Sequence, residues 1–476
     1  MLVQRGHCAR GSRRKTGSRG GLFAALLLAG SLSPLGWAAH AESIDEALVK
    51  AYQNNPQLTA ERARQRGTDE NVPQALSTYR PQITGELSAG LIAVRNLLPG
   101  NVIDTGRLRP WTIGVTVTQT LFNGFRTANS VRQAESQVRS GREALRNVGQ
   151  SVLLDAATAY MTVATNQELV NVEQLNVKLL RETLTVTRTR LAAGSVTPTD
   201  VAQAEARLSR GLADLNAAEV ALAISKASYV QVIGTEPGKL IFPSPTRHPL
   251  PTTREGALEI AQREHPAILA ASFDADSATS AVLIAQGALL PTVTVQGNVN
   301  RSVSTDTNLD INRTDQASVI GNVNVPIYDG GLAASQTRQA KEIVTQSRAV
   351  LEQVRNQTRA AVAGAFVAVE GARVAYAAAE SEVRAATVAL EGVRKEASGG
   401  QRATIDVLNA QQDLTSARGR LVQAQRDRVI AAFTLMSAIG RLDVKHLNLK
   451  TSEYLPEVHY HQVRDAWHGL RTPSGK

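Results

Sequence analysis

Two aspartates that lie 206 residues apart in this 476-residue chain are the charged residues whose surrounding sequence is most clearly repeated. Asp200 and Asp406 each follow a glycine by six residues, Gly194 and Gly400, and each is followed by valine. A glycine often ends a helix in the left-handed conformation, and an acid in the first turn stabilises the next helix. The pattern predicts two tight turns between helices, with capping as the first role of each aspartate.

Other residues that could do chemistry give weaker signals. The histidines His459, His461 and His468 lack the neighbouring cysteines or carboxylates that close a metal site, so we interpret them as solvated. The single cysteine, Cys8, lies near the N-terminus, ahead of an apolar run. We recognise no glycine-rich phosphate loop and no Ser/His/Asp set. The sequence therefore predicts no enzyme activity, no cofactor and no metal site.

The first 41 residues have the pattern of a secretory signal peptide. Six basic residues and no acid precede the cleavage pattern Ala39-His40-Ala41, with an apolar run from Leu22 to Leu32 between them. Without this leader the formal net charge falls from +10 to +4, which removes most support for a nucleic-acid partner. After Leu32 no run of about eighteen apolar residues occurs, so we expect strands to make any membrane crossing.

The chain repeats itself with constant spacing. Leu121–Phe125 aligns with Ile327–Gly331 at an offset of 206, and the same offset relates Gly234 to Gly440. One inserted residue turns the rest of a helix by about 100°, so a constant offset indicates long helices in strict register. Upstream the offset is 210, which places the four-residue difference in a strand hairpin between Pro81 and the first of these motifs.

Each copy is predicted to contain a helix, two strands, a very long helix, a tight turn and a final helix. The first helix covers 44–76 in copy one and 254–288 in copy two. Alternating apolar and polar residues predict strands around 83–91, 112–118, 293–299 and 318–327, with loops at 96–110 and 304–316. Such alternation suits a membrane barrel with a wet lumen, and equally a half-buried soluble sheet.

Heptad spacing from 124 to 193 and from 200 to 233, and in their copies, predicts coiled-coil packing. About 69 helical residues would reach roughly 100 Å. The helix 200–233 and the helix 254–288 together have about the same length as the long helix 124–193. We therefore expect 200–233 to stack end to end on 254–288. The helix that begins at Asp406 would stack on 44–76. Four strands cannot close a barrel, so a chain that spans a membrane must oligomerise.

These motifs resemble those of the TolC-like outer-membrane efflux proteins over residues 43–442. The resemblance lies in the paired Ala-Leu and Asn/His-Pro segments, the Leu-Phe-Asn-Gly and Ile-Tyr-Asp-Gly strand ends, and the turn motifs before Asp200-Val201 and Asp406-Val407. It implies a mainly α fold with a membrane β-barrel. Long coiled-coil helical hairpins and four transmembrane strands per chain would form a trimeric, twelve-stranded barrel and an α-helical periplasmic tunnel.

The resemblance also implies a domain organisation. A signal peptide (1–41) would precede a first efflux repeat (42–238), an equatorial linker (239–252), a second repeat (253–442) and an equatorial tail (443–476). The protein would lie in the cell outer membrane of a Gram-negative bacterium with a long periplasmic extension.

As an exit duct, it would serve efflux of drugs, detergents and toxic compounds and type I protein secretion. Its partners would be two further copies in a homotrimer, a periplasmic adaptor, an inner-membrane pump of RND or ABC type, and outer-membrane lipid. A trimeric coiled-coil envelope spacer or adhesin without transport is the alternative, and the sequence does not identify the cargo.

By the same resemblance, residues 402–409 line a constriction at the helical tips. Arg402 would pair with Asp200 as a lock, and Asp406 would form a pore-facing acidic ring. Asn409 stands where the best-known family member has a second acidic ring, so we expect a less acidic gate. The turn residues that would meet the adaptor are Gly194, Ser195, Gly400 and Gln401.

Overall fold

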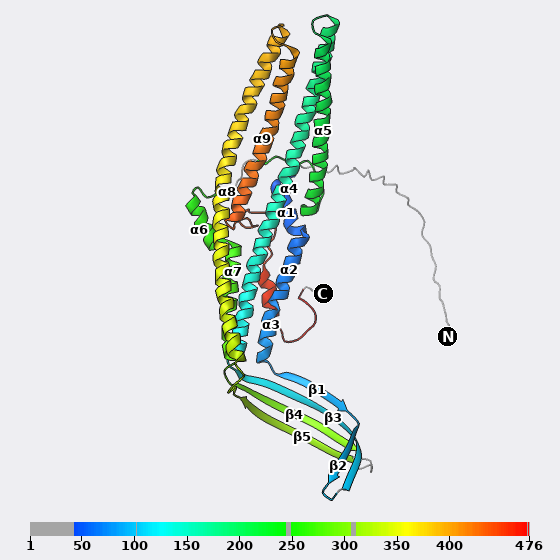
Figure 1. Cartoon of the computed structure of the whole chain (residues 1–476), viewed down its shortest axis with the longest axis vertical. Coiled ribbons are helices and arrows are strands. Elements are labelled where there is room, and N and C mark those ends of the chain that lie inside the picture. Colours follow the sequence, from blue (N-terminus) through cyan, green and yellow to red (C-terminus); the bar gives the residue numbers. More distant parts are fainter. Residues whose placement is uncertain (1–41, 101, 244–248, 306–310, 474, 476) are drawn as a thin grey trace, which may run out of the picture. The chain divides into compact units, whose positions relative to one another are not determined.

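The computed structural model describes residues 42–476 except 101, 244–248, 306–310, 474 and 476. This part of the chain is mainly α-helical and contains one antiparallel sheet (Figure 1). The predicted signal peptide, residues 1–41, lies outside the described residues.

The two copies give helices of matching length. Copy one supplies α1 (Ile44–Asn54), α2 (Pro56–Asp69), α3 (Asn71–Leu76), the 3₁₀ turn η1 (Ser77–Tyr79), α4 (Arg126–Ala192) and α5 (Pro198–Ile233). Copy two supplies α6 (Arg254–Glu264), α7 (Pro266–Gly287), α8 (Leu332–Ser398) and α9 (Thr404–Ala438), and α10 (Pro456–Val463) follows in the tail. Because α4 and α8 each have 67 residues, the inference of long helices in strict register is confirmed.

The first helix of each copy is interrupted, where one continuous helix was predicted. Asn55 and His265 have extended backbone, with ψ of 124° and 121°. The ring of a following proline disfavours helical backbone at the preceding residue. Each residue then caps the next helix, because Asn55 Oδ1 accepts from the Gln57 amide and His265 Nδ1 accepts from the Ala267 amide. The prediction of continuous helices is wrong for this reason.

The strands are longer than predicted. They are β1 (Gln82–Ala89), β2 (Ile92–Leu98), β3 (Val102–Asn123), β4 (Thr292–Thr305) and β5 (Ile311–Asn324), in the order β1-β3-β4-β5 with β2 also paired to β3. Residues 96–110 and 304–316, predicted as loops, are largely strand where they are described. Polar residues occupy both faces there, so pairing continues after the hydropathy alternation has ended.

The register separates an apolar face of the sheet from a polar one. One row across the four strands contains Ile83, Val117, Gly297 and Val319, and the adjacent row on the other face contains Thr84, Thr116, Asn298 and Ser318. On the apolar face Val115 is 48% exposed and Val299 is 63% exposed. This uncovered apolar surface is the pattern of strands that face lipid on one side and water on the other.

The long helices form a layer with two free edges. By their main contacts the order is α5-α4-α9-α8, and nearer the strands it is α2-α4-α7-α8. Figure 1 shows α4 with α5 as one hairpin and α8 with α9 as the other. The free edges are therefore α5 and α8 in the helices, and β1 and β5 in the sheet.

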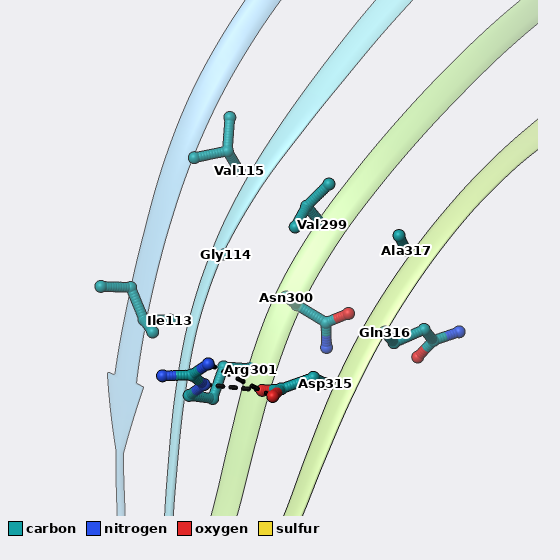
Figure 2. A pocket seen from close by; sticks show the side chains of 9 residues that line it. All are labelled: Ile113, Gly114, Val115, Val299, Asn300, Arg301, Asp315, Gln316 and Ala317. Carbon is teal, nitrogen blue, oxygen red and sulfur yellow. Dashed lines mark hydrogen bonds and ion pairs between the residues drawn. The ribbon is translucent and has the colours of Figure 1, made fainter.

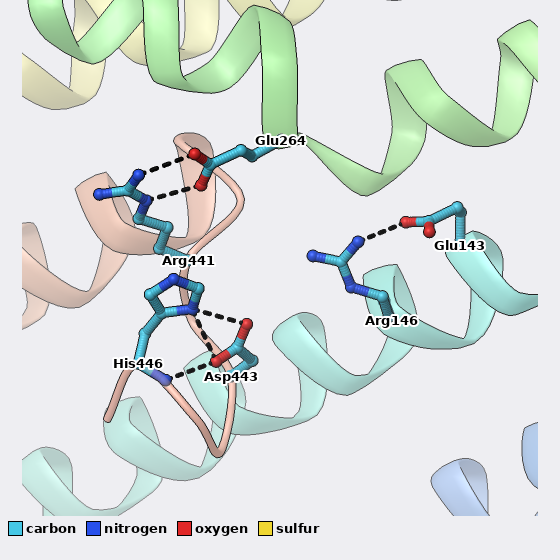
Figure 3. Close-up of polar contacts among 6 residues, drawn as sticks. All are labelled: Glu143, Arg146, Glu264, Arg441, Asp443 and His446. Atoms are coloured by element: carbon cyan, nitrogen blue, oxygen red, sulfur yellow. Dashed lines mark hydrogen bonds and ion pairs between the residues drawn. The ribbon is translucent and has the colours of Figure 1, made fainter. Parts of the chain in front are cut away.

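The half-helices stack the opposite way from the prediction. At the end of α5, Asn55 Nδ2 donates to the Val232 carbonyl at 3.0 Å, so α5 stacks on α1 and α2. After α9, Arg441 binds both carboxylate oxygens of Glu264 at 2.8 Å (Figure 3), so α9 stacks on α6 and α7. These hydrogen bonds from Arg441 lower the pKa of Glu264. Both pairings give helices of equal total length, so length alone could not distinguish them.

We expect Gly440→Ala to lower the free energy of unfolding by about 2–4 kcal/mol. Gly440 has φ = 84°, and an added Cβ would lie 2.8 Å from the Cα of His265 at the α9–α7 joint. Denaturant unfolding of detergent-solubilised protein measures this effect. Gly364→Ala in α8 is the control, because its Cβ would meet nothing within 4 Å, and equal losses at both sites would contradict the argument.

The largest buried cluster lies where the helices stack. Tyr160 is fully buried, and its hydroxyl lies 2.7 Å from the Glu42 carbonyl and 2.6 Å from the Ile241 carbonyl. Burial raises the pKa of Tyr160. The end of the second repeat joins this cluster through Leu442, and the start of the tail joins it through Val444, Leu447 and Leu449.

The tail then runs along α2 and α3, beyond the equatorial region that the sequence predicted for it. The Arg80 guanidinium lies 4.6 Å from the Trp467 ring, next to the beginning of β1. His459 Nδ1 lies 2.9 Å from Oδ2 of Asp69, whose side chain is fully buried. The interpretation of His459 as solvated is therefore wrong, because α10 packs against α2.

Two helical stretches have the length and composition to cross a membrane, contrary to the expectation from the sequence. They are Arg254–Gly287 and Leu332–Ser398, with mean hydropathies of 1.4 and 1.3 over their most apolar windows. Alanines raise these averages without forming an unbroken apolar run. Only 11% of the α8 window is buried within the chain, so α8 presents an apolar surface that the chain itself does not cover.

Candidate functional site

The two turns between long helices have the same geometry. Gly194 and Gly400 are left-handed, with φ of 74° and 78°. The next residues, Ser195 and Gln401, each donate their amide to the carbonyl five residues earlier at 2.9 Å. This hydrogen bond belongs to the left-handed helix end, so the predicted glycine caps are confirmed. All four residues are exposed.

Asp200 has a capping role. Its Oδ2 accepts hydrogen bonds from the Thr197 amide at 2.9 Å and the Thr197 hydroxyl at 2.8 Å, and its own amide donates to Thr197 Oγ1 at 3.4 Å. This reciprocal arrangement is a capping box at the start of α5. The hydrogen bond from the Thr197 amide is the main cause that lowers the pKa of Asp200.

Asp406 occupies the same helical position in α9 without a capping partner. The N-cap residue is Ala403, which has no side-chain acceptor. Oδ2 of Asp406 lies 4.0 Å from Nη1 of Arg402, and the Asp406 side chain is 39% exposed. Asp406 is therefore the freer of the two aspartates.

We expect Thr197→Ala to make the first-turn amides of α5 exchange hydrogen about fivefold faster, because the capping box is lost. Ala403→Thr should have the opposite effect on α9 by creating a capping box with Asp406. Hydrogen exchange followed by mass spectrometry resolves both segments. Unchanged exchange in both variants would show that the two turns do not depend on these caps.

Arg402 is bound within its own turn. Its Nε donates to Glu396 Oε2 at 2.9 Å, and its guanidinium approaches Asp406. The predicted Arg402–Asp200 pair is not formed within one chain, because Glu396 is nearer in the turn and Thr197 occupies the Asp200 carboxylate. A pair between Arg402 and Asp200 would have to form between copies or in another state.

Asn409 joins the two hairpins. Its Oδ1 accepts a hydrogen bond from Arg207 Nη2 at 2.9 Å, which connects α9 to α5. Beneath it an apolar cluster of α4, α5 and α9 contains Leu180, Leu184, Ala204 and Leu408. The sequence did not reveal Arg207, because its counterpart in the other copy is Asp413 and no repeated pattern marks it.

The tips thus present Arg402, which is paired with Glu396, and Asp406, whose carboxylate makes no close hydrogen bond within the described part of the chain, together with the exposed turn residues. Such an arrangement can bind a partner surface or attract cations, and it has no side chain set for covalent chemistry. Among the described residues there is no group of three or more His, Cys, Asp or Glu that could hold a metal ion.

Comparison with known proteins decides the family. The family described as "Outer membrane efflux protein" matches residues 47–235 and 257–441. The chain belongs to this family. The outer membrane efflux protein BepC of Brucella suis is 41% identical over 453 residues, which cover 95% of this chain and 97% of BepC. The outer membrane protein TolC of Vibrio cholerae is 28% identical over 443 residues, which cover 89% of this chain and 97% of that protein.

Solved structures share the fold. The CmeC outer membrane channel of Campylobacter jejuni superimposes with a TM-score of 0.73 at 14% sequence identity, with 89% of both chains covered. The predicted family and the location in the outer membrane are confirmed, and the protein is an outer-membrane efflux protein. The roles of Asp200, Arg402, Asp406 and Asn409 stay predictions.

Proposed function

We propose that three copies of this chain close into one channel that crosses the outer membrane and extends into the periplasm. The channel would pass drugs, detergents and secreted proteins supplied by an inner-membrane pump through a periplasmic adaptor, without a catalytic step. Residues 42–238 and 253–442 would be the two repeats of each wall segment. The linker 239–252 and the first part of the tail 443–476 would surround the region where the half-helices stack.

The observation that carries the proposal is a difference between the two copies along α5 and α9. Leu212 and Val220 of α5 are 41% and 51% exposed. Their counterparts 206 residues later are Arg418 and Arg426 of α9. Since α5 is a free edge and α9 is an inner helix, the edge is apolar where the equivalent inner positions are charged.

The other edge shows the same difference. Val374 and Val388 of α8 are 65% and 71% exposed. Their counterparts in the inner helix α4 are Glu168 and Glu182. Apolar residues at both free edges indicate that each edge is covered, and α5 of one copy against α8 of the next gives a head-to-tail contact that can close a ring.

The sheet supports the same closure. β1 and β5 are unpaired edges, and unpaired backbone groups are too costly in a lipid environment. Each chain contributes β1, β3, β4 and β5, which is fewer than the roughly eight strands of the smallest barrels. Three chains would supply twelve strands and pair every edge.

The apolar face has the height of a bilayer core. Val293 and Val303 mark its ends on β4, where the ion pair of Arg301 with Asp315 interrupts the apolar residues one row before Val303, and ten residues of strand span about 33 Å. At the usual barrel tilt this gives an apolar band of about 25 Å. Phe122 lies opposite Val293 and Trp111 opposite Val303, as expected for aromatic residues at both membrane interfaces.

Cysteine cross-linking tests the ring directly. The only cysteine of the sequence precedes residue 42, so introduced cysteines are unique in the described chain. Ile224→Cys on α5 and Val374→Cys on α8, treated with a bismaleimide in membranes, should give a ladder that ends at three chains. The single variants should give no ladder. Absence of bridging, or a ladder that continues beyond three chains, would contradict the proposed trimer.

Planar-bilayer recording separates the channel from its alternative. A trimer that conducts supports the exit duct. A trimer that inserts and never conducts would instead support the coiled-coil spacer or adhesin.

We expect Asp406→Ala to raise the concentration of multivalent cation that half-blocks the current from the periplasmic side by about tenfold. Three Asp406 carboxylates around one axis would attract such a cation. Asp200→Asn is the matched control, because the Asp200 carboxylate is engaged with Thr197. An unchanged block in Asp406→Ala would remove the proposed acidic ring.

A further inference from the structure

Beyond the apolar residues, the same face of the sheet carries a series of arginines that follow one another along the strands. Arg301 lies opposite Ile113 near the end of the apolar band, and Figure 2 shows it paired with Asp315. The strand alternation places four further arginines on the same face beyond it. In order of distance from the band these are Arg313, Arg109, Arg107 and Arg95.

The five arginines form a ladder along the strands. Each successive row of this face, two residues further from the band, adds one arginine, so the ladder covers roughly 27 Å measured along the strands, which turn at β2 and the outer part of β3 (Figure 1). All five side chains are exposed. Among the described side chains on these rows the only acid is Asp315, which accepts hydrogen bonds from Arg301 Nε at 2.6 Å and Arg313 Nε at 3.0 Å.

The three outer arginines have no acidic partner among the described side chains. No ion pair of Arg95, Arg107 or Arg109 occurs within the part of the chain that the structure describes. The described part of the ladder thus has an excess of four positive charges over Asp315, while Asp306 and Asp310 lie outside the described residues. An exposed cationic strip of this length needs an anionic partner in its surroundings.

The opposite face of the same rows carries no charge among its described side chains. It contains Ile92, Val94, Gly106, Leu108, Pro110, Thr112, Ser302, Ser304, Asn312 and Thr314. In the proposed barrel this uncharged face continues the polar face that lines the lumen, so the arginines point away from the lumen. They therefore cannot act as a filter for the substances that pass through the channel.

We propose that this ladder binds the phosphate groups of a phosphorylated glycolipid in the outer leaflet of the membrane. The proposal rests on the proposed barrel, because it requires the apolar face to meet lipid. Trp111 marks the membrane interface; Arg301 lies one row inside this level, and the other four arginines lie at it or beyond it. The planar guanidinium matches a phosphate with two parallel hydrogen bonds and stays charged beside lipid.

The length of the ladder selects the class of lipid. A simple phospholipid carries its anionic group at one depth, and one or two rows of arginine would be enough for it. Rows over roughly 27 Å suit a headgroup with anionic groups at several heights, as in a phosphorylated oligosaccharide on a lipid anchor. Asp315 orients Arg301 and Arg313 at the base of the ladder, which reduces the side-chain entropy that binding would cost.

Native mass spectrometry of the purified protein measures the binding. The probes are diphosphorylated lipid A, the same lipid without phosphates, and phosphatidylglycerol. The test variant is Arg107→Gln/Arg109→Gln, and Arg107→Lys/Arg109→Lys retains the charge. Arg181→Gln/Arg263→Gln removes the same charge from exposed positions on α4 and α6, outside the proposed contact between copies, and serves as the control.

Diphosphorylated lipid A should bind the test variant about tenfold more weakly than wild type, which corresponds to the loss of about one strong ionic hydrogen bond per chain. The lysine variant should lose less affinity for diphosphorylated lipid A, and the control on α4 and α6 should lose none. Equal binding of the dephosphorylated lipid, or an unchanged affinity of the test variant, would overturn the proposal. Equal binding of phosphatidylglycerol would overturn the assignment to a glycolipid.

Channel recording on the same samples separates this inference from the proposed function. If the test variant conducts like wild type and binds lipid A unchanged, the ladder has no lipid role and the channel stands. If wild-type protein neither assembles nor conducts, the barrel itself is refuted, and the lipid proposal with it.

Discussion

Replacement of Arg402 by alanine is expected to raise the single-channel conductance several-fold. Arg402 holds the second turn together through Glu396 and partly neutralises Asp406. Without it the turn loses its internal ion pair, and the Asp406 carboxylates of three copies repel one another without compensation. Both effects favour wider separation of the tips. Unchanged conductance in planar bilayers would remove Arg402 from the gate.

Two further variants identify the partner through which Arg402 acts. If the contact with Glu396 matters, Glu396→Gln should reproduce the rise in conductance. If Arg402 reaches Asp200 of another hairpin or copy, Asp200→Asn should reproduce it instead. Thr197→Ala controls for the loss of the cap that Asp200 also provides. The pattern among these variants assigns the closing contact to one turn or to the space between turns.

A charge on the apolar edge of α8 is expected to reduce the fraction of the protein that forms trimers more than tenfold. Val374→Glu would bury one carboxylate at each of three contacts, and an unpaired buried charge costs several kcal/mol. Native mass spectrometry of protein extracted from membranes gives the trimer fraction. Val374→Ala should assemble nearly normally, because it removes contact area without adding a charge.

A compensating substitution separates misassembly from misfolding. Ile224→Lys on α5 alone should also impair the trimer, whereas combination with Val374→Glu should restore it if the two edges meet. Glu168→Val, at the position in α4 that corresponds to Val374, should leave the trimer unchanged. Normal assembly of Val374→Glu would show that the exposed face of α8 is not a contact between copies.

Local signals in the sequence predicted the parts that depend on neighbouring residues. Gly194 and Gly400 predicted the helix ends, because a left-handed residue there is a property of the backbone itself. Thr197 and Asp200 form a cap within four residues of chain. The Asn55-Pro56 pair also carried a local signal of an interrupted helix, because proline disfavours helical backbone at the residue before it, and the prediction of one continuous helix overlooked it.

Contacts between distant segments were not predictable. Arg207 and Asn409 are 202 residues apart, and no regular spacing connects them. The stacking of α5 on α1 was also not predictable from the sequence, because stacking on α1 and α2 or on α6 and α7 gives helices of the same total length. The continuation of β3 to Val102 was missed since backbone pairing persists where the hydropathy pattern stops.

By itself the sequence determined the periodic part of this protein: two copies, long helices of equal length, glycine-capped turns and strands with one apolar face. These features follow from the identities and spacings of residues close along one chain. Only the tertiary structure decided which half-helix lies under which hairpin, which partner holds Arg402, and which helices and strands are left as edges. Such choices depend on side chains that meet across hundreds of residues, where several arrangements satisfy the same local pattern.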